Sequence, residues 1–551
     1  MTDLAKVQKK KRKINVAGYL FILPAMLFFC LYILYPIFFI VKNSLLKWAT
    51  LSNMEFVGLE NFIKVFQDST FWVTMKNSIL WIVVTVPVQA ILGFFLAYAI
   101  EERIKSKKAD GKAFSRTFYR TLFFIPVVTS VTVVAIMFSK IFQPYQGIIG
   151  HYLNSWFGMS PTINVLGNSK AALWGIMLAN IWEWTGWSMI MYIGGISQIS
   201  EDVKEAARID GANTWQEIIY VYIPALGSVH KSLLMLGIIG SLQTYALIGV
   251  MTGGGPNHAT EMPGTYIFMK GFTESQMGYA CAMSVAVLIF ALVLTFIQVR
   301  FLGSGDFMKK GNKLWEQLKK KNRLGHRDRS WKIFLAVMAV IALIPLVYAL
   351  SLSVRTQNSI YDPRLFVTDL TIGNYIKAIS DNPTILNNFI SSLVISVIST
   401  AATVLCASMA VYGFSRKNVY GKVIMYNLIL CTLMVPISAL VIPITQLNSR
   451  MGLLDNYFGL IFPYIALNIP YAVTILQGFM KGVPKELEEA AGLDGCNIVQ
   501  LYTRIVMPML KPGIVVVAIW TFLTCWNELF SGIMYYDKSN NKNIAVDCAA
   551  V

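Results

Sequence analysis

Long apolar segments constrain this chain more than any other feature of its sequence. About 20 apolar residues suffice to cross a bilayer as a helix, and residues 14–39 carry no charge. Ten further low-charge segments follow, at residues 78–100, 121–142, 172–196, 232–252, 278–302, 331–353, 388–413, 424–447, 456–480 and 512–536. The composition agrees, since 56% of residues are hydrophobic and only 14% are charged. We therefore predict an all-α polytopic membrane protein with about eleven transmembrane helices, because a β-barrel would show short alternating segments.

The net charge of +18 is explained by basic residues in short loops between the apolar segments. This distribution favours membrane topology over nucleic-acid binding. The most basic loops are residues 9–13, 105–116 and 309–329. By the positive-inside rule they are cytoplasmic, as is the N-terminus. Alternation then places outside the loops 41–77, 143–171 and 253–277, which are poorer in Lys and Arg.

An internal repeat determines the predicted organisation. Residues 205–224 read EAARIDGANTWQEIIYVYIP, and residues 489–508 read EAAGLDGCNIVQLYTRIVMP. At one offset of 284, Glu205, Ala206, Ala207, Asp210, Gly211, Asn213 and Pro224 match Glu489, Ala490, Ala491, Asp494, Gly495, Asn497 and Pro508. Each copy follows the fourth apolar segment of its half, on the predicted cytoplasmic side. The halves are therefore predicted to be parallel tandem repeats.

The repeat also gives the predicted domain boundaries. Residues 1–302 form a first half with six transmembrane helices and the loop at about 200–226, and residues 303–330 form a basic cytoplasmic linker. Residues 331–551 form a second half with five transmembrane helices and the loop at about 484–510. Val551 corresponds to residue 267, before the sixth helix of the first half, so we expect the second half to lack its last helix. A longer chain or another polypeptide would supply it.

The duplicated loop has a clear physical interpretation. Each copy predicts a short amphipathic helix, a glycine turn, a second helix and a proline before the next membrane segment. Ala206 and Ala207 keep one face of the first helix narrow, so that a partner can approach closely, and Gly211 permits a sharp reversal. Glu205 suits the start of a helix and could pair with a basic partner residue. A plain re-entrant or surface helical loop is the alternative, and two copies at equal spacing on one side argue against it.

These residues resemble the EAA motif of permease subunits in bacterial ATP-binding-cassette importers. In the first half, Ile125-Pro126 and residues 252–256 (TGGGP) are similar to the larger permease of maltose-type carbohydrate importers. Motifs similar to the smaller permease occur in the second half, at Met434-Val435-Pro436, Ile442-Pro443, residues 484–491 (PKELEEAA) and Trp526-Asn527. The chain therefore resembles a fusion of the two subunits. We call residues 200–226 and 484–510 the coupling loops.

The resemblance implies a multi-pass permease of the bacterial cytoplasmic membrane that imports a sugar or oligosaccharide by alternating access. Its expected partners are two cytoplasmic ATP-binding subunits, an extracytoplasmic solute-binding protein and membrane lipid. The chain itself is not expected to be an enzyme or to hold a cofactor, since it has no G-x-x-x-x-G-K-[ST] sequence for binding phosphate. ATP and magnesium would be bound by the partner subunits. The scattered cysteines and histidines show no metal-ligand or catalytic spacing.

A candidate substrate path lies on the fourth apolar segment. Asn180, Glu183, Trp184 and Trp187 share one helical face and combine hydrogen-bonding groups with aromatic rings, which suits sugars. An interfacial tryptophan belt is the competing explanation. The resemblance adds Gly240, Ser241 and Thr244 of the fifth segment. The offset of 284 relates the path residues to four residues of the second half, namely Tyr464, Leu467, Asn468 and Glu528. We interpret Glu528 as an interhelical hydrogen-bonding or pore group.

Two other functions fit less well. An ion-coupled secondary transporter also commonly has two parallel repeats, but duplicated cytoplasmic loops have no role in that mechanism. A membrane-embedded enzyme or receptor fits less well still, because the sequence shows no catalytic constellation of residues. Within the importer class, glycerol phosphate or another polyol derivative is the competing substrate. A phosphate would favour Arg or Lys in the path, and residues 172–196 and 232–252 contain neither.

Overall fold

A computed structural model describes residues 16–50, 53–104, 109–158, 164–302, 328–416, 419–435, 437–528 and 531–532. Several sequence predictions fall on other residues. The basic segment 9–13, most of the linker 303–330, Pro436 and the end of the chain at 537–551 lie outside the described residues. What was predicted for them stays a prediction.

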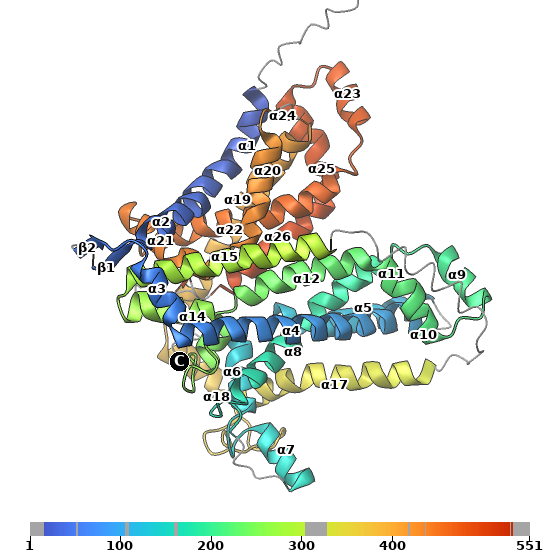
Figure 1. Ribbon diagram of the computed structural model, residues 1–551. Helices are drawn as coiled ribbons and strands as arrows, with labels where there is room; N and C mark the ends of the chain where they lie inside the picture. Colours follow the sequence, from blue (N-terminus) through green and yellow to red (C-terminus); the bar gives the residue numbers. More distant parts are fainter. Residues whose placement is uncertain are drawn as a thin grey trace, which may run out of the picture. The chain divides into compact units, whose positions relative to one another are not determined.

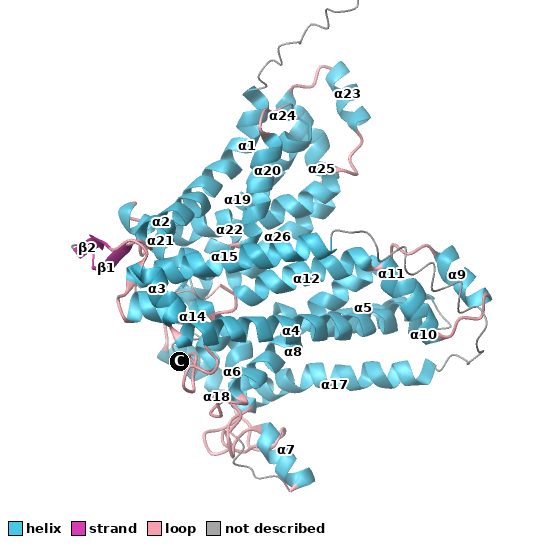
Figure 2. Ribbon diagram, viewed as in Figure 1, coloured by secondary structure: helices cyan, strands magenta, loops and turns pink. Residues whose placement is uncertain are grey.

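The described chain is mostly helical, with a single short two-stranded sheet, which confirms the all-α prediction (Figure 2). Up to residue 302 the helices are α1 (Val16–Phe29), α2 (Tyr35–Asn43), α3 (Glu60–Gln67), α4 (Ser69–Tyr98), α5 (Ala109–Val128), α6 (Val131–Ile141), α7 (Ile148–Phe157), α8 (Ala172–Ile196), α9 (Glu201–Ile209), α10 (Thr214–Gln216), α11 (Ile223–Ala225), α12 (Gly227–Leu242), α13 (Ala246–Met251), α14 (Pro263–Phe268) and α15 (Met277–Leu302). A short antiparallel hairpin pairs β1 (Leu46–Thr50) with β2 (Asn53–Phe56).

The remaining α-helices are α17 (Asp328–Ser353), α18 (Gly373–Asp381), α19 (Thr384–Arg416), α20 (Lys422–Cys431), α21 (Ile437–Arg450), α22 (Tyr457–Met480), α23 (Lys485–Leu493), α24 (Ile498–Gln500), α25 (Met507–Met509) and α26 (Lys511–Trp526). Wider π-helical turns form η1 (Cys30–Leu34), η2 (Ala99–Arg103), η3 (Glu217–Tyr222), η4 (Met269–Thr273) and η6 (Leu501–Val506), and η5 (Thr432–Met434) is a 3₁₀ turn. Most of these turns continue a neighbouring α-helix, so they lengthen it without interrupting the chain direction.

All eleven predicted segments are largely helical, but not all are single straight spans. Among the described residues, six continuous helices are long and apolar enough to cross a membrane, and three bent pairs raise the number to nine. The sharpest bend, 91°, separates α5 from α6 shortly after Pro126, which removes a backbone donor from the helix. α8 has 25 residues and sufficient length. It is not among the nine, because its polar and tryptophan residues lower its hydropathy.

The chain packs as two compact units that do not follow its order. Among the described residues, one unit contains residues 16–39, 390–434 and 443–532, and the other contains 40–389 and 435–442. In the first unit, α1 packs against α22, although the two helices come from opposite sequence halves. These packing units do not test the predicted domain boundaries, which remain a prediction.

In the second unit, α4, α5 and α8 lie side by side, and α17 lies along the same bundle (Figure 1). A buried cluster joins α4, α8 and α17 around Phe94, Tyr192 and Leu335. The indole Nε1 of Trp182 donates a hydrogen bond to the carbonyl of Ala342 at 3.2 Å. A helix of the second sequence half is therefore part of the core that positions α8.

Candidate functional site

The two coupling loops fold in the same way at their first turn. Two residues after the end of α9 and of α23 comes a glycine with left-handed backbone, Gly211 at φ 81° and Gly495 at φ 85°. The next residue closes each helix, with Ala212 N donating to Ala207 O at 3.0 Å and Cys496 N to Ala491 O at 3.0 Å. This is the glycine-terminated helix end in which residues with a Cβ are strained. The predicted glycine turn is present in both copies.

The second turn of each loop is also repeated. Asn213 accepts a hydrogen bond from Gln216 N at 2.9 Å, and Asn497 accepts one from Gln500 N at 2.9 Å. Each glutamine side chain in turn accepts from its asparagine N–H, which completes a capping box. A π-helical segment follows, η3 or η6, and then Pro224 or Pro508 within the first turn of the next short helix. Two of the matched pairs, Gly211 with Gly495 and Asn213 with Asn497, are therefore residues that the backbone requires.

The predicted contact residues of both loops lie mainly at the surface. Glu205, Ala206, Asp210 and Gly211 are exposed, as are Glu489, Ala490, Asp494 and Gly495. The two alanines of the first loop differ, since Ala206 points outward while Ala207 is buried against its own unit. Ala491 is half-buried at the matching position. Only one alanine of each pair is therefore fully available to a partner.

Sequence reasoning missed the most exposed apolar side chains of these loops. Ile209 is 85% exposed, and Leu493, which matches it at offset 284, is 91% exposed. Two further matched pairs of apolar residues are exposed, namely Val203 with Leu487 and Trp215 with Val499. Large apolar side chains repeated at the surface of two loops are typical of an interaction site. The offset itself was the signal that could have identified them.

A buried ionic network supports the first coupling loop. Arg103 at the end of η2 pairs with Glu217 of η3 at 2.9 Å, and both side chains are 3% exposed. Lys204 of α9 pairs with Glu102 at 2.9 Å, and Arg208 contacts both Glu102 and Glu217 at 3.1 Å. Burial alone would lower the pKa of the Arg208 guanidinium, but these carboxylates raise it above its usual value. The network fixes α9 to the end of a membrane helix.

The second coupling loop has a simpler support. Arg416, the last residue of α19, pairs with Glu488 of α23 through Nε and Oε1 at 2.6 Å, and both side chains are largely buried. Arg416 Nη2 also donates to the carbonyl of Val483, just before α23. One arginine therefore fixes both the side chain and the backbone at the start of α23. We call α9 and α23, the first helices of the two coupling loops, the coupling helices.

The predicted path residues of α8 lie in different surroundings. The carboxamide oxygen of Asn180 accepts a hydrogen bond from Gln89 of α4 at 2.9 Å. Glu183 is 3% exposed, and its Oε2 atom has no hydrogen-bond partner among the described residues. Trp184 is half-buried, and Trp187 packs against the cluster around Phe94. The shared face thus lies mostly against protein, and Gln89 is a neighbour that the sequence did not indicate.

The other predicted path residues are bonded locally. Ser241 Oγ of α12 donates to Gly237 O at 2.7 Å, and Thr244 Oγ1, just after the end of α12, donates to Gly240 O at 3.3 Å. Nothing lies within 4 Å of the position where Gly240 would carry a Cβ. In the other unit, the Tyr464 hydroxyl donates to Glu528 at 3.2 Å and Asn468 donates to Tyr464 O at 2.9 Å, whereas Leu467 is half-buried. This supports the interpretation of Glu528 as an interhelical group.

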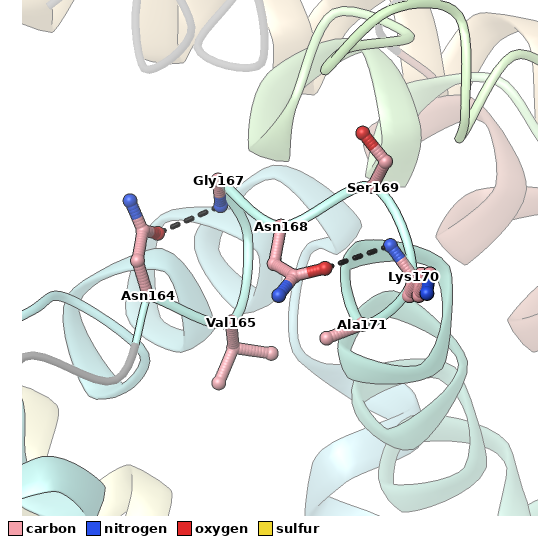
Figure 3. A pocket seen from close by; sticks show the side chains of 7 residues that line it. All are labelled: Asn164, Val165, Gly167, Asn168, Ser169, Lys170 and Ala171. Carbon is pink, nitrogen blue, oxygen red and sulfur yellow. Dashed lines mark hydrogen bonds between the residues drawn. The ribbon is translucent and has the colours of Figure 1, made fainter. Parts of the chain in front are cut away.

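A hollow of about 780 Å³ lies in the loop that leads into α8 (Figure 3). Its lining consists of Asn164, Val165, Gly167, Asn168, Ser169, Lys170 and Ala171. Asn164 accepts from Gly167 N at 2.7 Å and Asn168 accepts from Lys170 N at 2.9 Å, so the two amide side chains shape the loop. None of the predicted path residues lines this hollow, and it belongs to a loop predicted to be extracytoplasmic.

The chain is similar to known transport proteins over most of its length. The profile of the family described as "Binding-protein-dependent transport system inner membrane component" matches the chain twice, over residues 89–302 and 400–539. The probable ABC transporter permease protein YurN of Bacillus subtilis is 32% identical over 293 residues, which are 53% of this chain and 97% of YurN. The lactose permease protein LacF of Rhizobium radiobacter is 28% identical over 52% of this chain and 94% of LacF. The trehalose/maltose permease protein MalF of Thermococcus litoralis is 30% identical over 53% of this chain and 94% of MalF.

Proposed function

Because the chain belongs to the family of binding-protein-dependent transport system inner membrane components, we propose that it is the permease of an ATP-driven importer for a sugar or oligosaccharide. Two copies of the family domain stand in one chain, so both permease halves are present together. The proposed substrate class is supported by relatives named for lactose and for trehalose and maltose. The proposed location is the bacterial cytoplasmic membrane, with the N-terminus in the cytoplasm.

The duplicated coupling loops carry this proposal. Two equivalent surfaces, each with an exposed apolar residue at the end of a short helix, suit two equivalent partner subunits. We infer that Ile209 and Leu493 insert into two cytoplasmic ATP-binding subunits, which bind ATP and magnesium and drive alternating access of the permease. The chain itself would then need no nucleotide site or cofactor. An extracytoplasmic solute-binding protein would deliver the sugar.

The first prediction concerns these partners. The purified chain alone should hydrolyse no ATP, and activity stimulated by the loaded binding protein should appear only when the ATP-binding subunits are added. The double variant Ile209→Asp/Leu493→Asp should lower co-purification of these subunits by at least about tenfold, because burying one such side chain contributes roughly 1.5–3 kcal/mol. Tyr420→Asp is a matched control, since Tyr420 is 90% exposed in a different loop, which the alternation of the predicted segments also places in the cytoplasm. Normal co-purification of the double variant would contradict the docking proposal.

The second prediction concerns the substrate path. Trp187 lies on the same face of α8 as Asn180, whereas Tyr464 of the second half is bonded to Glu528. Trp187→Ala should therefore reduce sugar uptake by about tenfold, because a well-placed aromatic ring contributes about 0.5–1.5 kcal/mol to binding beyond its buried area. Tyr464→Ala should reduce uptake by less. Uptake of glycerol phosphate should be measured beside that of sugars.

Trp174→Ala provides the control for this experiment, since Trp174 belongs to the same helix and is exposed. Complex assembly must be measured for each variant, because Trp187 also packs against the core cluster. A larger loss of uptake in assembled Tyr464→Ala than in assembled Trp187→Ala would place the path in the second half. Competition by glycerol phosphate but not by sugars would support the polyol alternative.

A further inference from the structure

Both coupling helices are anchored at an equivalent place on a membrane helix. In the first half the anchor on the membrane helix is Glu102, four residues after Tyr98. In the second half it is Arg416, four residues after Tyr412. Each of these tyrosines also lies beside a tyrosine of the π-helical segment, although the two partners occupy different positions of the repeat. The ring of Tyr98 lies 5.0 Å from that of Tyr222 in η3, and the ring of Tyr412 lies 5.6 Å from that of Tyr502 in η6.

The anchoring residues on the coupling helices are equivalent as well. Lys204 of α9 and Glu488 of α23 match at the offset of 284 that relates the two loops. Lys204 pairs with Glu102 at 2.9 Å, and Glu488 pairs with Arg416 at 2.6 Å. All four side chains are about one-tenth exposed or less. The same ion pair therefore occurs twice, with its polarity reversed.

The reversal has a physical consequence for pairing. If α9 were seated on α19, Lys204 would face Arg416, and if α23 were seated on η2, Glu488 would face Glu102. Each wrong pairing would bring two like charges together in a buried place, where neither could be solvated and their repulsion would be strong. Each correct pairing instead neutralises both charges. The free-energy difference between the correct and the exchanged pairing is therefore larger than the stabilisation from either ion pair alone, because attraction is replaced by repulsion.

We propose that this reversed polarity determines which coupling helix is anchored to which membrane helix. Glu102, Lys204, Arg416 and Glu488 act as positioning residues and make the two coupling loops non-interchangeable in a chain that contains both. A fused chain has particular need of such a device, because two similar loops are present at high local concentration in one folding molecule. The proposal concerns folding of this chain and holds whether or not the loops bind ATPases.

The test uses the full chain purified in detergent, with its unfolding midpoint, its monodisperse yield and proteolytic cleavage of α23 as measurements. Glu488→Lys and Arg416→Glu each create a buried like-charge pair, and each should lower the midpoint by about 5 °C or more. Arg416→Glu/Glu488→Lys restores opposite charges and should recover most of the loss, although the Arg416 bond to Val483 is not restored. If the pair acted only through packing, recovery of the midpoint would not depend on whether the two side chains carry opposite charges.

A second double variant tests the pairing rule directly. Lys204→Glu/Glu488→Lys keeps the net charge but gives each coupling helix the charge of the other, so it should be impaired at least as much as Glu488→Lys. Glu60→Lys/Lys64→Glu reverses a pair whose side chains are about half exposed, and it should behave like the parent. The proposal is overturned if Arg416→Glu/Glu488→Lys is no better than the single variants. It is equally overturned if Lys204→Glu/Glu488→Lys is as stable as the parent.

Discussion

Replacing Gly495 with valine should abolish most transport while leaving membrane insertion intact, and Gly211→Val should do the same in the first coupling loop. The backbone at these glycines has φ of 85° and 81°, and a left-handed conformation costs a non-glycine residue roughly 1–2 kcal/mol, with more for a β-branched one. The helix end would relax by losing the bond from Cys496 N to Ala491 O. Leu493, two residues earlier, would then no longer be presented in its present position.

Gly492→Ala is the matched control for this prediction. Gly492 also belongs to α23, nothing lies within 4 Å of its missing Cβ, and its backbone is not left-handed. Alanine should therefore be tolerated there, or even stabilise the helix by about 0.5–1 kcal/mol. Uptake and ATPase co-purification should be measured for all three variants. Parental uptake by both valine variants would mean that the left-handed turn is dispensable for coupling.

The coupling loops could be predicted from the sequence because their structure is encoded locally. Gly211 and Asn213 each satisfy a backbone requirement within a few residues, and the same requirement occurs again at Gly495 and Asn497. Apolar length likewise predicted every long helical segment. The bend after Pro126 was not predicted, because a proline in a helix can produce either a mild kink or a break, and the outcome depends on neighbouring packing.

The substrate path was less predictable because it depends on contacts between distant segments. Periodicity placed Asn180 and Glu183 on one face of α8 but could not identify what that face meets. The hydrogen bond from Gln89 to Asn180 joins residues 91 positions apart, and the bond from Trp182 to Ala342 joins residues 160 apart. The basic residues at 105–116 were interpreted only as a sign of topology, and Arg103 was not singled out. The pairing of Arg103 with Glu217 depends on how η3 folds back on η2.

The largest loss of stability should follow removal of Glu217. Its carboxylate accepts from Arg103 at 2.9 Å, from the Tyr98 hydroxyl at 3.1 Å and from Arg208 at 3.1 Å. Glu217→Ala would leave the buried guanidinium of Arg103 without its carboxylate partner. Even in the parent, Arg103 Nε has no hydrogen-bond partner among the described residues. Breaking a buried pair from one side typically costs about 3–5 kcal/mol. We expect Glu217→Ala to lower the unfolding free energy by that amount and to reduce the yield of folded chain.

Two companion variants separate the charge effect from simple loss of packing. Glu217→Gln keeps most of the side-chain volume and a hydrogen-bond acceptor but loses the charge, so it should fall between the parent and alanine. Arg103→Leu/Glu217→Leu removes both buried charges and should be more stable than Glu217→Ala, because no uncompensated charge remains at this place. Glu60→Ala removes a partner from the exposed pair with Lys64 and should leave the unfolding free energy close to that of the parent, because solvent screens this pair. If Glu217→Ala unfolds no more readily than Glu60→Ala, the ionic network does not hold the first coupling loop, and its support must come from the packing of Tyr98 against Tyr222.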